Sequence, residues 1–182
     1  YQVRYVGDGL YAINEVDSTR YPAERLPLPI PPVAGEPASE AAAPADSGDT
    51  FDLLVVYTPG ARAAAGGTSA MNALINLGVT ETNAAYANSG IVSRVRLVGT
   101  AETNYTETAD MGADLERLQR TSDGVMDEVH VLRDRVGADL VMLVVRTYTV
   151  DACGLGYLMS GRWLEYGFQE WAFSVVARNC IG

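Results

Sequence analysis

The side chains that could do chemistry in this chain are few: one histidine, two cysteines and 23 scattered carboxylates. His130 lies four residues after Met126 and next to Val129, on or beside the packed face of an expected helix. A histidine in that setting is more often a hydrogen-bonded structural residue than a base or a metal ligand. We therefore expect no catalytic and no metal-binding residue within the chain.

A glycine-rich segment, Gly66-Gly67-Thr68-Ser69, lies between an expected strand and an expected helix, where a phosphate-binding loop could form. Such a loop uses a lysine to reach the phosphates. The chain has no lysine, because all 13 of its basic residues are arginine. We therefore predict that Thr68 or Ser69 caps the helix. Only the order of strands and helices supports a nucleotide-dependent enzyme, and a fold alone does not establish a function.

Serine and paired-carboxylate chemistry are also disfavoured. The segment Met159-Ser160-Gly161 lacks the glycine-flanked elbow of serine hydrolases. Asp127 and Glu128 are adjacent, so they diverge by about 100° around a helix and cannot share a substrate as a glycosidase pair does. These two carboxylates are predicted to lie on a solvated helix face.

The two cysteines, Cys153 and Cys180, each follow an expected strand and are too few for a structural zinc site. A disulfide between them would stabilise the fold by about 3 to 4 kcal/mol through loop closure, and it would indicate an exported protein. The alternative is two free, buried thiols in a reducing compartment.

The first fifty residues divide into two parts. Residues 1–20 alternate between apolar and polar side chains on both sides of Gly7-Asp8-Gly9, which predicts a β-hairpin. Residues 21–50 contain seven of the eight prolines, a density that excludes a helix or a central strand and predicts an extended linker. We expect the domain boundary near Asp49.

Residues 51–182 alternate between apolar runs and amphipathic stretches. Strands are predicted at 51–58, 91–103, 138–145, 154–159 and 173–178, and helices at 68–88 and 122–136, with a short helical piece around Leu115 and Leu118. Strands that are joined by helices form parallel sheets through right-handed crossovers. The predicted fold class is an open α/β sheet.

In these stretches the chain resembles the metzincin zinc endopeptidases, and among them the reprolysin-like bacterial secreted metalloproteases. The resemblance runs from about Phe51 to Cys180, and its parts follow in the order of the family. The resembling stretches are FDLLVVYTP (51–59), ETNAAYANSG (81–90), DGVMDEVH (123–130), GADLV (137–141), CGLGYLM (153–159) and FSVVARNC (173–180).

The resemblance implies a mixed five-stranded sheet with one antiparallel edge strand and two main helices. The edge strand would hold an extended peptide substrate antiparallel to itself. The residues of this substrate-binding edge would be Gly154, Leu155, Gly156, Tyr157 and Leu158. Residues 51–182 would form the upper subdomain of the catalytic domain, residues 1–20 the end of a propeptide and residues 21–50 its tether.

The zinc motif of that family, His-Glu-x-x-His-x-x-Gly-x-x-His, does not occur in the chain. Its usual spacing from the last strand would start it within about ten residues of Cys180. We therefore expect a truncated or processed part of a secreted zinc endopeptidase, which is inactive alone and has zinc only in its full-length parent. The expected partners are a peptide or protein substrate and either the lower subdomain or an oligomer partner.

The second hypothesis is a non-catalytic secreted module that binds peptides or proteins through the same edge strand. Under both hypotheses the net charge of -10 disfavours nucleic acid and anionic membranes as partners. No apolar run approaches the roughly 18 residues that a membrane span needs. Because the chain begins at Tyr1 without a visible signal sequence, we expect it to have been trimmed upstream and to be extracellular or periplasmic in a bacterium.

Overall fold

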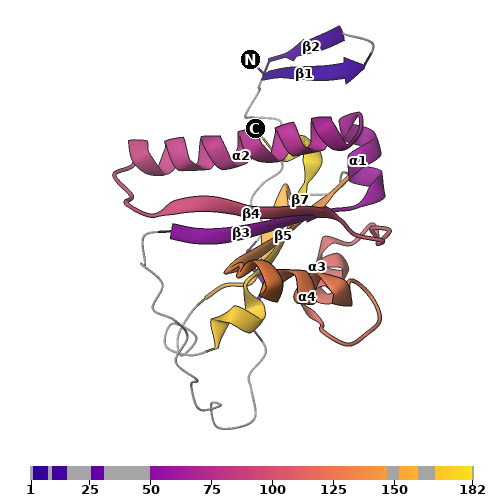
Figure 1. The fold of residues 1–182 in the computed structure, drawn as a ribbon, viewed down its shortest axis with the longest axis vertical. Helices are drawn as coiled ribbons and strands as arrows, with labels where there is room; N and C mark the ends of the chain where they lie inside the picture. The colour runs from indigo at the N-terminus through magenta and orange to yellow at the C-terminus, as the bar shows by residue number, and fades with distance from the viewer. Residues whose placement is uncertain are drawn as a thin grey trace.

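The computed structural model describes residues 2–7, 10–15, 26–30, 50–146, 152–159 and 167–181 (Figure 1). Within these ranges, a five-stranded sheet lies between two layers of helices (Figure 1). The strand order is β4-β3-β5-β7-β6. The strands are β3 (Thr50–Tyr57), β4 (Arg94–Glu102), β5 (Leu140–Val145), β6 (Gly154–Gly156) and β7 (Phe173–Ala177).

The strands β3, β4, β5 and β7 run parallel to one another, and β6, at one edge, runs antiparallel to β7. The predicted mixed sheet with one antiparallel edge strand is confirmed. At the centre of β3, Leu54, Val55 and Val56 are at most 2% exposed. Their continuous apolar run predicted a strand with both faces covered, because helices pack on both sides of such a sheet.

The helices form one layer on each face of the sheet. On one face lie α1 (Pro59–Ala65) and α2 (Thr68–Asn88), and on the other lie α3 (Met111–Gln119) and α4 (Asp127–Val136) (Figure 1). Alternate residues of β3 point to the two layers, as the strand period requires. Leu54 and Val56 belong to the core with α3 and α4, whereas Leu53 and Val55 pack with α1 and α2.

The sequence does not predict helix α1, because the dipeptide Pro59-Gly60 is typical of a turn at the end of a strand. The Thr58 hydroxyl accepts a hydrogen bond from the Ala61 N–H at 3.0 Å, and proline follows in the first helical turn. Proline is favourable there, since its fixed φ suits the helix and its missing N–H would have no partner inside the helix. The helix ends at Gly66, whose φ is +96°.

Two predicted helix starts are wrong. The N-cap of α2 is Gly67, with φ of +111° and no side-chain cap, so neither Thr68 nor Ser69 caps the helix. Helix α4 begins at Asp127 rather than near Ser122. Gly124 and Met126 have φ values of +80° and +60°, and this left-handed backbone cannot continue a right-handed helix. The strand predicted at 91–103 likewise begins later, at Arg94.

The predicted N-terminal hairpin is present as β1 (Gln2–Gly7) and β2 (Leu10–Asn14), with Val3 opposite Ile13. Within the linker predicted at 21–50, the structure describes only residues 26–30 and Thr50, the first residue of β3. The turn residues Asp8 and Gly9 and the boundary at Asp49 lie outside the described residues. None of the helices in the described part of the chain is both long and apolar enough to cross a membrane.

Candidate functional site

The edge strand β6 is the element to which the family resemblance gave the role of substrate binding. Its three residues, Gly154 to Gly156, pair antiparallel with residues 176 to 174 of β7. Tyr157 and Leu158 continue the chain beyond the last of these pairs. Because β6 is the last strand in the sheet order, the backbone groups on its outer side are open to pairing with another extended segment.

An N-terminal segment of this chain pairs with that outer side. The Leu28 N–H donates to the Gly156 carbonyl at 3.1 Å, and the Leu158 N–H donates to the Leu28 carbonyl at 3.2 Å. Leu28 and Tyr157 thereby form a parallel bridge. The edge of β6 therefore pairs with an extended backbone, here in the direction opposite to the antiparallel one expected for a substrate.

The two faces of β6 carry different side chains. Leu155 is 7% exposed in the core beneath α3 and α4, and Tyr157 packs against the same core. By strand alternation, Gly154 and Gly156 face the other side of the sheet. A Cβ atom at Gly154 would lie 3.1 Å from the Val175 carbonyl oxygen, which leaves little room for a side chain. The segment therefore has one apolar face and one face without side chains.

Aromatic and charged neighbours surround Tyr157. Its ring meets Trp171 edge to face, with the ring centroids 5.0 Å apart. Burial raises the pKa of the Tyr157 phenol, the carboxylate of Glu116 raises it further, and Arg120 opposes the increase. The phenol is therefore protonated at neutral pH, so it can donate a hydrogen bond but cannot act as a base.

Trp171 belongs to η3 (Phe168–Trp171), which both α3 and α4 hold in place. Arg133 of α4 donates from Nη1 to the Gln169 carbonyl at 2.7 Å. Gln119 of α3 donates from Nε2 to the Glu170 carbonyl at 3.2 Å. These two bonds fix the segment that presents Trp171 to Tyr157.

A disulfide joins Cys153 and Cys180, as the sequence predicted, with their Cα atoms 5.6 Å apart. Cys153 immediately precedes β6, and Cys180 ends η4 (Arg178–Cys180), which follows β7. The Ala177 N–H also donates to the Cys153 carbonyl at 2.8 Å. The disulfide thus links the start of the short edge strand β6 covalently to the segment that follows β7.

His130 has a structural role in this geometry. Its Nε2 lies 3.0 Å from the Leu118 carbonyl, to which it donates, and its ring centroid lies 5.1 Å from that of Phe173. Both cysteines are bonded to each other. Among the residues that the structure describes, no three histidine, cysteine, aspartate or glutamate side chains are placed to hold a metal ion. These residues therefore do not fit a catalytic zinc ion.

The carboxylates Asp127 and Glu128 have separate partners. Asp127 Oδ2 accepts from the Gly124 N–H at 3.1 Å, in the turn that begins α4. Glu128 Oε1 accepts from the Thr103 hydroxyl at 2.9 Å. The predicted exposed face is correct for Glu128 but wrong for Asp127, which is half-buried. Ser160 and Gly161, considered above for serine hydrolysis, lie outside the described residues.

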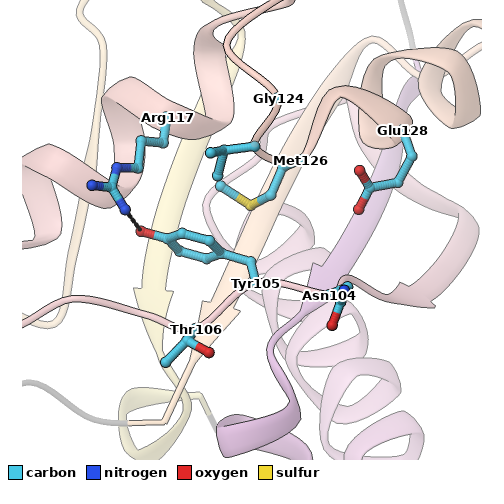
Figure 2. Close-up of a pocket in the computed structure, with 8 residues that line it drawn as sticks. Asn104, Tyr105, Thr106, Arg117, Gly124, Met126 and Glu128 are labelled. Carbon is cyan, nitrogen blue, oxygen red and sulfur yellow. Dashed lines mark hydrogen bonds between the residues drawn. The ribbon is translucent and has the colours of Figure 1, made fainter.

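A surface pocket of about 380 Å³ lies beside Tyr105, on the α3 and α4 side of the sheet (Figure 2). The Tyr105 hydroxyl donates to Asp114 at 2.5 Å and accepts from Arg117 at 3.5 Å. Asp114 is fully buried and also accepts from the Thr108 N–H at 2.9 Å. Burial and Asp114 together raise the pKa of Tyr105 well above its ordinary value. These bonds attach the 104–108 loop to α3 and give Tyr105 and Arg117 partners within the fold.

The sequence profile described as Metallo-peptidase family M12B Reprolysin-like matches residues 48–178. Two curated relatives are named peptidyl-Asp metalloendopeptidase. The protein from Stenotrophomonas maltophilia (strain R551-3) is 35% identical over 161 residues, and the protein from Xanthomonas campestris pv. campestris is 34% identical over 164 residues. These alignments cover 85% and 86% of this chain but only 37% and 39% of the two relatives.

Among solved structures, a chain in a chaperone–substrate complex matches the fold with a TM-score of 0.57 at 21% sequence identity. That match covers 70% of this chain and 22% of the other. The family profile covers most of residues 50–181, which include the whole five-stranded sheet. The profile and the bacterial relatives agree, so this chain belongs to the reprolysin-like M12B family of metallopeptidases.

Proposed function

We propose that residues 51–182 are the peptide-binding, sheet-bearing half of the catalytic domain of a secreted zinc endopeptidase. The observation that carries this proposal is the outer side of β6, where Gly156 and Leu158 hydrogen-bond to the extended backbone at Leu28. A substrate strand would use the same groups. In this mode the backbone bonds supply affinity and the side-chain contacts supply specificity.

Proteins cleaved at aspartate are the proposed substrates of the full-length parent. This part of the proposal depends on the relatives, which are named peptidyl-Asp metalloendopeptidases. The present chain would contribute the backbone edge of β6 and the aromatic pair Tyr157 and Trp171. It spans less than two fifths of the length of those relatives, so the bond-cleaving groups are proposed to lie outside it.

The zinc ion of the parent is proposed to be held outside residues 1–182. Catalytic zinc sites use three protein ligands, commonly histidines, and leave a fourth position for water. Here the one histidine is bonded to the Leu118 carbonyl and the cysteines are bonded to each other. The chain alone is therefore proposed to bind an extended peptide without hydrolysing it.

The α2 side of β5 and β7 is the proposed packing surface for the rest of the catalytic domain. Leu140, Met142, Ser174 and Val176 are only half-buried on this side, whereas their neighbours on the opposite side are buried. Helix α2 lies across the β3 and β4 part of the sheet and leaves this part less covered (Figure 1). Covering the half-buried apolar side chains on this side with another apolar segment would stabilise the fold.

Residues 1–20 are proposed to be the end of a propeptide, and residues 21–50 its tether. Leu28 in the tether already covers the edge that a substrate would need. Its parallel direction differs from the antiparallel direction proposed for a substrate. The disulfide between Cys153 and Cys180 supports an extracellular or periplasmic location, where disulfides form and persist.

Two measurements test this function. Sequencing the coding DNA beyond residue 182 should reveal His-Glu-x-x-His within about ten residues of Cys180. The purified chain should leave an aspartate-containing fluorogenic peptide intact, with or without added zinc. A stop codon directly after Gly182, with secretion of the short chain, would instead favour a non-catalytic binding module. Cleavage of the peptide by the purified chain would contradict the proposed division of roles.

A further inference from the structure

The α3 side of the edge segment carries an apolar surface that backbone pairing alone does not require. We call this surface, formed by Leu155, Tyr157 and Trp171, the aromatic subsite. Leu155 is 7% exposed, and its Cδ2 lies 4.0 Å from where a Cβ atom would stand on Gly112, at the start of α3. The edge-to-face contact with Trp171 holds the ring of Tyr157 beside it.

The side chain of Leu28 is placed at this subsite. Leu28 lies directly opposite Tyr157 in the parallel bridge, and residues that are paired in this way point to the same face of a sheet. Leu28 is half-buried and packs against the core that contains Leu155. Leu26, two residues earlier, is 89% exposed. The segment is therefore bound through one apolar side chain in addition to its two backbone hydrogen bonds.

The residues next to Leu28 suit this arrangement. In an extended segment, the N–H and C=O groups of successive residues point to opposite sides. Since the N–H and C=O of Leu28 both face β6, the backbone nitrogens of Pro27 and Pro29 face away from it. Proline lacks an N–H, so its ring costs no ladder hydrogen bond on that outer side. Leu28 is thus the residue of the Pro-Leu-Pro triplet that can pair with the edge.

We propose that the aromatic subsite selects an apolar side chain, at the position opposite Tyr157, in any extended peptide that lies along this edge. This inference rests on the proposed function, because it specifies which residue the peptide-binding edge accepts. A charged side chain there would lose its hydration against a buried apolar core. The aspartate of a substrate therefore occupies another position in the bound peptide.

Amide hydrogen exchange of the full chain, followed by NMR, tests the subsite. In the unmodified chain, the Leu28 and Leu158 amides should be protected, because both donate to backbone carbonyls. Leu28→Ala keeps those donors but removes most of the half-buried side chain. It should speed exchange at both amides by about tenfold. Leu28→Met has similar volume and should restore protection, and Leu26→Ala is the matched exposed control.

The outcomes separate the subsite from the proposed function. If both amides are protected and Leu28→Ala exchanges as slowly as the unmodified chain, the subsite inference is overturned while the peptide-binding edge stands. If the two amides are unprotected in the unmodified chain, the backbone pairing that carries both proposals is contradicted. Faster exchange in Leu28→Ala, with Leu28→Met and Leu26→Ala unchanged, supports the apolar selection.

A second experiment examines peptides added from outside. The Leu28→Asp variant should release its own segment, and synthetic hexapeptides with the sequence of residues 25–30 can then be titrated against it. The peptide with leucine at its fourth position should bind at least about tenfold more tightly than the same peptide with aspartate there. Equal affinities for the two peptides would overturn the selection of an apolar side chain.

Discussion

Leu28 and Tyr157 lie directly opposite each other in a parallel bridge, which joins an N-terminal segment to the edge strand of the main sheet. The two residues belong to parts of the chain that are far apart in sequence, and the hydrogen bonds on both sides of the bridge are 3.1 and 3.2 Å long. Any peptide that binds this edge must displace a segment of the same chain. That segment competes at the high effective concentration of a tethered ligand.

The disulfide is expected to be a main support of the edge strand. Replacing both Cys153 and Cys180 by serine should lower the free energy of unfolding by about 3 to 4 kcal/mol, because the unfolded chain regains the freedom of the loop between them. Urea unfolding measures the change. Adding a thiol reductant to the unmodified chain should give the same loss, whereas it should not affect the double serine variant.

The buried carboxylate Asp114 is expected to stabilise the 104–108 loop. Asp114→Ala should lower the free energy of unfolding by about 3 kcal/mol, since it leaves the Tyr105 hydroxyl and the Thr108 N–H without their acceptor. Glu116→Gln, which removes an exposed ion pair with Arg120 at the C-cap of α3, should change the free energy of unfolding by less than about 1 kcal/mol. Similar losses in the two variants would contradict the structural role of Asp114.

Alkaline pH should destabilise the fold through ionisation of the Tyr105 phenol. The pKa of Tyr105 is raised above its ordinary value of 10.0, by burial first and then by Asp114. Below about pH 10, the phenol is protonated in both the folded and the unfolded chain, so it adds nothing to the pH dependence of the free energy of unfolding. Above it, the unfolded chain loses this proton first, so the free energy of unfolding falls by up to about 1.4 kcal/mol per pH unit. Urea unfolding over this range should show a smaller slope in Tyr105→Phe, while Tyr57 and Tyr157, whose pKa values are also raised, contribute the remainder.

The start of α1 depends on a single hydroxyl. Thr58 is fully buried and its Oγ1 accepts from the Ala61 N–H, so Thr58→Ala should cost about 1 to 2 kcal/mol of stability. Thr58→Ser keeps the hydroxyl and should retain most of that stability. Thermal or urea unfolding of the two variants checks the result, and an equal loss in both would show that the methyl group matters rather than the cap.

The residues that were predicted correctly are those whose local pattern determines their structure. The apolar runs around Val55 and Leu143 predicted strands covered on both faces, because a run of four to eight apolar residues between turn residues is typical of such a strand. Helix α1 was missed although Thr58 followed by Pro59 is a helix-start signal, since the alanine-rich stretch after it has no amphipathic period. The burial of Asp114 has no local signal, because its partners come from the preceding loop.

The edge strand was predicted from the sequence at 154–159, and the family resemblance identified it as the antiparallel edge. The structure limits this strand to three residues, two of them glycine, which are too few to show a strand period by themselves. Its pairing with Leu28 could not be predicted, because a bridge between distant segments depends on the tertiary fold and leaves no periodic signal. The prolines around Leu28 predicted only an extended backbone.

The most direct test of the central claim is a titration of the isotope-labelled chain with an extended, aspartate-containing peptide. We expect amide shifts concentrated at residues 154–158, stronger binding to the Leu28→Asp variant than to the unmodified chain, and an unchanged peptide mass after prolonged incubation. Shifts confined to the pocket around Tyr105, with residues 154–158 unaffected in both chains, would contradict the assignment of β6 as the peptide-binding edge.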